Sequence, residues 1–82
     1  MILHVYPTRL HTEQSPRWRA RAEDRGVRLW TFPKPSETDA ATKAIAMVRA
    51  ALEAGETGDF VGLADGSFRR RRVGEMVIDD AQ

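Results

Sequence analysis

The chain has 82 residues, 41% of them hydrophobic, and its 13 basic and 12 acidic side chains leave a formal net charge of +1. A chain this short forms one domain with a thin core, has no cysteine for disulfides or thiolate metal sites, and contains no apolar run of about 20 residues that could span a bilayer. We therefore expect a single α+β domain over residues 1–82, located in the cytoplasm, that is not an enzyme and holds no metal and no cofactor.

Three strands are predicted in the first 32 residues. Residues 2–6 are apolar but too few for a signal peptide, so we expect a first strand there. Residues 11–16 are polar and end at a proline, as loops do. Residues 17–22 alternate Arg-Trp-Arg-Ala-Arg-Ala, which is the period of a half-buried strand, and residues 27–32 are rich in β-branched and aromatic side chains. The second and third strands should therefore form a hairpin.

A helix is predicted from about Thr38 to Ala54. Ser36 or Thr38 is a suitable N-cap, and Gly55 stands where a C′ glycine belongs. Apolar residues recur at helical spacing and should cover the face that packs on the sheet. This stripe consists of Ala41, Ile45, Val48 and Leu52, with Ala44 and Ala51 beside it.

A second hairpin follows the helix. Residues 60–63 should form a strand, and Asp65-Gly66 a tight turn with Gly66 at positive φ. Residues 75–78 are predicted to add a short edge strand, and residues 79–82 to fray. The predicted order is β-β-β-α-β-β, an antiparallel sheet with one helix packed on one face.

The spacing of several small and aromatic residues resembles that of two bacterial families. The positions that carry the first resemblance are Val5 and Pro7, Trp18 and Ala20, Gly26, Phe32, Ala40, Ala41 and Ala44, and Asp65 and Gly66. They are similar to a small bacterial family known only as a domain of unknown function, which implies a fold and no activity. The middle of the chain, two strands and an alanine-rich helix, also resembles the HicB antitoxin family, which implies a toxin-binding surface. HicB-like chains have an acidic, glycine-rich first hairpin, whereas this chain has Arg17, Arg19 and Arg21 there.

No constellation of side chains indicates catalysis. His4 and His11 are the only histidines, and they match no metal-ligand spacing. Three serines, Ser15, Ser36 and Ser67, stand in turn or cap positions, where serine makes local hydrogen bonds. The arginines, which make up eleven of the thirteen cations, are the feature above background. They reflect either compositional bias or contacts with phosphate, to which arginine binds bidentately.

Alternation along residues 17–22 places Arg17, Arg19 and Arg21 on the sheet face away from the helix. The neighbours of these arginines depend on the turn of the first hairpin. A two-residue turn at Asp24-Arg25 adds Arg28, Trp30 and Phe32 to the arginine side, a basic and aromatic surface typical of single-strand binders. A turn at residues 24–26 with a glycine bulge sends Trp30 and Phe32 to the core instead and places Leu29 and Thr31 beside the arginines. We favour the bulge, because Gly26 suits its left-handed position and a thin core needs the aromatic rings.

The run Arg69, Arg70, Arg71 and Arg72 forms either a strand, with two side chains pointing each way, or an exposed arm. The sequence thus predicts a non-catalytic binding module whose basic sheet face contacts an anionic partner, most simply the nucleic acid backbone. The candidate contacts are Arg17, Arg19, Arg21, Arg28, Arg69, Arg70, Arg71 and Arg72, with Trp30 and Phe32 as aromatic contacts. The alternative is a protein-interaction module, such as an antitoxin-like or phage-encoded regulator, or a small homodimer that uses a sheet edge.

Overall fold

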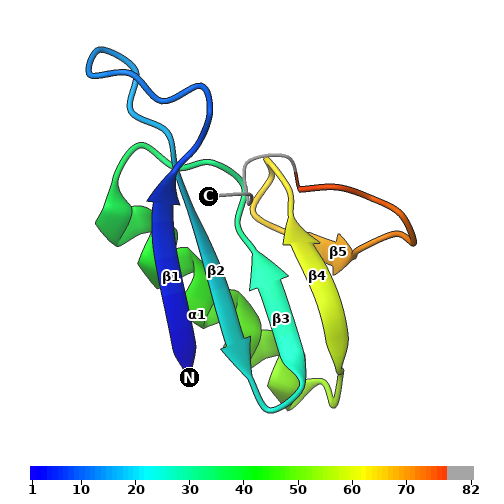
Figure 1. Ribbon diagram of the computed structural model, residues 1–82. Helices are drawn as coiled ribbons and strands as arrows, with labels where there is room; N and C mark the ends of the chain where they lie inside the picture. Colours follow the sequence, from blue (N-terminus) through cyan, green and yellow to red (C-terminus); the bar gives the residue numbers. More distant parts are fainter. Residues whose placement is uncertain (78–82) are drawn as a thin grey trace.

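The computed structural model describes residues 1–77 and contains one helix and a five-stranded sheet in the predicted order (Figure 1). The elements are β1 (Ile2–Pro7), β2 (Trp18–Asp24), β3 (Val27–Trp30), α1 (Glu37–Glu53), β4 (Gly58–Gly62) and β5 (Phe68–Arg70). The predicted α+β class is confirmed. Residues 75–77 form no strand, so the predicted edge strand is wrong for them. Ile78 and the fraying predicted for residues 79–82 lie outside the described residues.

The strands lie side by side in chain order, with α1 across one face of the sheet (Figure 1). Neighbouring strands are antiparallel except β3 and β4, which are parallel, so the sheet is not wholly antiparallel as predicted. The 17-residue helix causes this difference. It is about 25 Å long and returns the chain from the C-terminal end of β3 to the end of the sheet at which β3 begins. The next strand therefore runs in the same direction as β3.

The first hairpin has a two-residue turn, and the glycine-bulge register is wrong. Asp24 pairs with Val27, and the turn residues Arg25 and Gly26 both have positive φ, at 45° and 84°. These values are those of a type I′ turn, whose twist matches that of the flanking strands. The register differs by two residues from a turn at Asp24-Arg25. Because a shift of two keeps each side chain on its face, Arg28 and Trp30 lie on the arginine side.

Helix α1 begins at the predicted cap. Ser36 is the N-cap, and its hydroxyl accepts a hydrogen bond from the Asp39 amide at 3.1 Å, so Ser36 rather than Thr38 has this role. At the other end Gly55 has φ 74° and its amide donates to the Leu52 carbonyl, as expected of a C′ glycine. Within residues 1–77 no helix combines the length and the apolar character needed to cross a membrane.

The buried face of α1 is rotated about the helix axis relative to the predicted apolar stripe. Its buried residues are Ala40, Ala44, Met47, Val48 and Ala51. They pack on Ala20 and Ala22 of β2 and on Leu29 of β3, all 0% exposed. The predicted stripe is correct at its centre, but Ala41, Ile45 and Leu52 are only half-buried. The small alanines of β2 and α1 let the helix lie close to the sheet.

The second hairpin closes with three residues instead of the predicted tight turn. The Leu63 amide donates to the Ser67 carbonyl, so residues 64–66 form the loop. Gly66 has φ 90°, which confirms the predicted positive φ and is typical of three-residue hairpin loops.

Candidate functional site

The sheet face opposite α1 is ordered in rows that run across the strands. We call this surface the arginine face. One row crosses all five strands and consists of His4, Arg21, Trp30, Val61 and Arg69. A second row crosses the first four strands and consists of Ile2, Glu23, Arg28 and Asp59. Tyr6 and Arg19 form a third, shorter row toward the loop between β1 and β2.

Three arginines of the second strand region lie along this face as predicted. The Thr8 amide donates to the Arg17 carbonyl at 2.9 Å, so the pairing of β1 with β2 extends to Arg17, and Arg17, Arg19 and Arg21 share one side. Arg17 is exposed, whereas Arg19 and Arg21 are half-buried and have interaction partners. Arg19 Nη1 donates to the Thr31 carbonyl at 2.7 Å, which holds this guanidinium over β3.

Trp30 is on the arginine face but is not available to a ligand. Its side chain is only 1% exposed, because Arg71 lies over the ring at 4.7 Å and Arg28 at 5.9 Å from the ring centroid. The tryptophan is therefore the centre of a second small core, separate from the core under α1. Its expected role in base stacking would require both arginines to move. Phe32, the other predicted aromatic contact, follows β3 and is 41% exposed.

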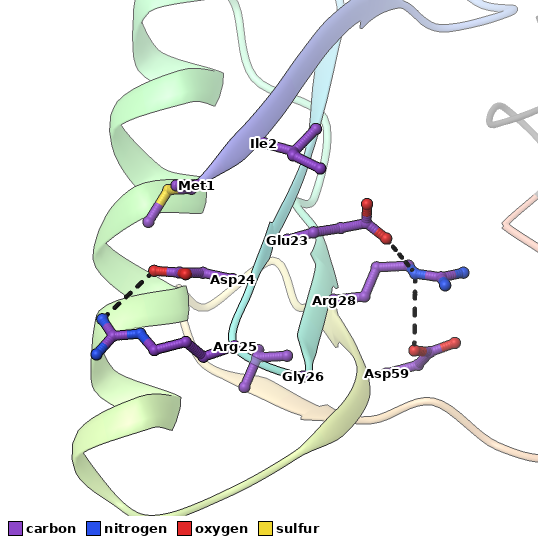
Figure 2. A pocket seen from close by; sticks show the side chains of 9 residues that line it. Met1, Ile2, Glu23, Asp24, Arg25, Gly26, Arg28 and Asp59 are labelled. Carbon is purple, nitrogen blue, oxygen red and sulfur yellow. Dashed lines mark hydrogen bonds and ion pairs between the residues drawn. The ribbon is translucent and has the colours of Figure 1, made fainter.

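In the row that contains Arg28, acidic side chains outnumber the single arginine. Arg28 Nε lies 2.7 Å from a Glu23 carboxylate oxygen and 4.0 Å from one of Asp59, so it sits between two acids (Figure 2). The neighbouring turn holds another pair, Arg25 with Asp24, at 3.4 Å. A shallow pocket opens among these residues, but charges of both signs line it. Arg17 and Arg19 lie toward the other end of the arginine face, away from these acids.

The arginine run at the end of β5 is used largely for structure. Arg69 makes two hydrogen bonds to the Glu75 carboxylate, at 2.9 and 2.8 Å. Arg70 points to the helix side, where it pairs with Glu56 and lies over the Phe60 ring, while Arg71 donates to the Glu75 carbonyl. Opposite directions for Arg69 and Arg70 agree with the strand alternative. Arg72, which is exposed, follows the strand.

The sequence did not predict a role for Glu75, because a spacing of six residues between an acid and an arginine does not indicate that the two side chains are paired. Its carboxylate also accepts from the Arg72 amide at 2.9 Å, which closes the segment after β5. The Arg69 guanidinium, followed by this amide, lowers the pKa of Glu75 from 4.5 to about 2. A lowered pKa means that the ionised form stabilises the fold.

We expect this ionised carboxylate to make stability depend on acid. Its contribution is fully present above pH 4.5 and is lost as the pH falls toward about 2, because over this range the unfolded state binds the proton while the folded state stays ionised. Urea midpoints measured between pH 6 and pH 2.5 should fall less steeply for Glu75→Gln than for the parent. Glu13→Gln, in an exposed loop, is the control and should follow the parent. Equal acid dependence in the parent and Glu75→Gln would contradict this role.

The two histidines have local contacts. His11 Nδ1 accepts a hydrogen bond from the Arg17 amide at 3.0 Å, and its ring lies edge-on to Trp18 with centroids 4.8 Å apart. His4 lies against Tyr6 with centroids 5.3 Å apart. His11 thus orders the loop that leads into β2 and positions the backbone of Arg17.

Comparison with protein-family models, curated proteins and solved structures finds no match to this chain. The resemblances to the domain of unknown function and to HicB antitoxins therefore stay predictions from the sequence.

Proposed function

We propose that this chain is a non-catalytic binding module that contacts the phosphate backbone of nucleic acid through the arginine face. The observation that supports it best is the line of Arg17, Arg19 and Arg21 on one side of the sheet. Alternate residues of a strand are about 6.6 Å apart, close to the spacing of successive phosphates along an extended strand. Arg17 is exposed, and Arg19 Nη1 donates to the Thr31 carbonyl at 2.7 Å, which positions the Arg19 guanidinium on this face.

The burial of Trp30 restricts the mode of binding. Because its ring is covered by Arg28 and Arg71, contacts to bases would fall to the half-exposed Phe32. Contacts to phosphates position a nucleic acid but carry little sequence information. The proposed module therefore binds without strong sequence preference, and it acts in the cytoplasm, where such a partner is abundant.

The proposal is tested by titrating labelled single-stranded and duplex oligonucleotides of mixed sequence with the parent protein and following fluorescence anisotropy at low salt. We expect both to bind, with affinities that change little when the sequence is permuted. A parent that fails to bind either oligonucleotide but co-purifies with a small protein would instead support the second candidate, a protein-interaction module. The exposed apolar residues of β1 favour that candidate.

A further inference from the structure

Strand β1 forms one edge of the sheet, with β2 as its one strand neighbour among residues 1–77 (Figure 1). The hydrogen bond from the Thr8 amide to Arg17 shows which backbone groups point inward. In an antiparallel ladder, hydrogen-bonded residues alternate with residues whose N–H and C=O point away. Residues 2, 4 and 6 therefore face β2, whereas Leu3, Val5 and Pro7 direct their backbone groups to the outer edge. Pro7 has no N–H, so Leu3 and Val5 are the strand residues that offer both a donor and an acceptor there.

The two sheet edges differ in how they are protected. The edge strand β5 has three residues, of which two are arginines, and short charged edges resist pairing with other strands. Strand β1 has six residues and no formally charged side chain. Two of its large apolar side chains are exposed, Ile2 at 64% and Leu3 at 39%. An uncharged edge of this length with exposed apolar side chains is a template for pairing with another strand.

The flank of α1 next to this edge is also apolar. Its opposite flank, with Lys43, Met47 and Ala50, lines a groove beside Gly66 and Phe68 near β5. With 100° between successive helical residues, Ile45 and Leu52 lie on the other flank, toward β1. Both are half-buried. The sheet of one copy therefore covers these two side chains only in part.

We propose that β1 pairs antiparallel with β1 of a second copy of this chain, about a two-fold axis that passes beside His4. In this register Leu3 lies opposite Val5 of the second copy, and Val5 opposite its Leu3. The outward N–H and C=O of both residues are then hydrogen-bonded in both copies. A register centred on Val5 would instead place Leu3 opposite Pro7, which cannot donate, and would leave the Leu3 carbonyl without a partner.

The second copy is the occupant that the edge fits, because the sequence pairs with itself in this way. Leu3 meets a β-branched valine on the helix side, a favourable cross-strand pair, and no like charges face each other along residues 2–7. Pro7 stops the ladder at its outer end, which limits the pairing to a short segment. Closed two-fold pairing covers both β1 edges, so among residues 1–77 the strand edges that stay open are those of β5, which bears arginines.

The two-fold axis is perpendicular to the sheet, so both helices lie on one side and both arginine faces on the other. The two β2 strands are then three strand spacings apart, roughly 14 Å. The pairing itself is independent of the proposed function. If that function holds, the pairing doubles the length of basic surface offered to an anionic chain.

The first test is the mass of the parent in solution, measured by sedimentation equilibrium. We expect twice the chain mass of 9.2 kDa at micromolar or higher concentration. Leu3→Lys places a charge in the interface and should return the mass to that of one chain, with an unchanged far-UV circular dichroism spectrum. Leu10→Lys makes the same chemical change at a 70% exposed loop position and should leave the mass doubled. A parent that stays at the single-chain mass through the millimolar range would overturn the proposal.

The second test fixes the register, and it uses the absence of cysteine from the chain. In the proposed pair the two copies of residue 4 lie directly opposite, with Cα atoms about 4.5 Å apart in a non-hydrogen-bonded pair, which suits a disulfide. His4→Cys should therefore form a disulfide-linked dimer under mild oxidation. Ile2→Cys, on the same strand and face, should not, because its two copies are about 13 Å apart along the strands. Efficient crosslinking at residue 2, or equal yields at the two positions, would contradict the pairing.

Discussion

Replacing Trp30 by alanine is expected to lower the free energy of unfolding by about 3–5 kcal/mol. Trp30 is 1% exposed, and removing its ring leaves a cavity beneath Arg28 and Arg71, which lose an aromatic contact as well. An 82-residue domain has a total stability of roughly 4–12 kcal/mol, so the variant should be close to unfolding at room temperature. Urea unfolding followed by far-UV circular dichroism measures the loss.

Two further variants test whether the loss of stability comes from removing a buried aromatic ring at position 30. Trp30→Phe keeps an aromatic ring under the guanidinium groups, and the Trp30 Nε1 atom has no hydrogen-bond partner within residues 1–77, so this change should cost much less. Phe32→Ala removes an aromatic ring that is 41% exposed and should also cost less. A Trp30→Ala protein with the urea midpoint of the parent would show that the ring is not buried on the arginine face.

The triple change of Arg17, Arg19 and Arg21 to glutamine is expected to weaken nucleic acid binding roughly 10- to 100-fold at low salt. Each charged hydrogen bond to phosphate contributes about 1.5–3 kcal/mol, and the variant loses part of this free energy because the phosphates bind water instead. A control with the same loss of charge is Arg25→Gln, Lys43→Gln and Arg49→Gln, in the β2–β3 turn and on α1. If position matters more than net charge, the control should bind nearly as well as the parent.

The triple variant also tests whether the arginines contribute to the fold. Arg19 donates to the Thr31 carbonyl and is half-buried, so a moderate fall in the thermal midpoint is expected. Arg17→Gln alone changes an exposed side chain and should leave the midpoint unchanged. Weaker binding by Arg17→Gln therefore reports on the site itself. Equal losses for the triple variant and its charge-matched control would assign binding to net charge.

Much of the fold could be predicted because its local signals agree. The cap at Ser36, the glycine at 55 and the apolar spacing between them define α1, and alternation defines β2. The turn types were harder, because Arg25-Gly26 and Asp65-Gly66 each suit both two- and three-residue loops. Which loop forms depends on how Val27 and Leu29 pack against the helix, a contact between distant parts of the chain.

The candidate site was predictable in part. Period-two alternation places Arg17, Arg19 and Arg21 together whatever the register. The partners of the other arginines depend on tertiary contacts, such as the Glu75 carboxylate on Arg69 and the Trp30 ring under Arg71. The sequence pattern contains no signal for either contact. The parallel alignment of β3 and β4 likewise depends on the length of α1 and on the end of the sheet to which α1 returns the chain.

The most direct test of the proposed function is the salt dependence of binding to a single-stranded oligonucleotide, for the parent and for Arg17→Gln. Binding through phosphates releases counterions, so the logarithm of the binding constant should fall linearly with the logarithm of salt concentration, by about 0.7 for each contact. We expect a parent slope of about 2 in magnitude, reduced by roughly 0.7 in Arg17→Gln and unchanged in Arg49→Gln. A parent that does not bind at low salt, or a slope that Arg17→Gln and the triple variant leave intact, would contradict it.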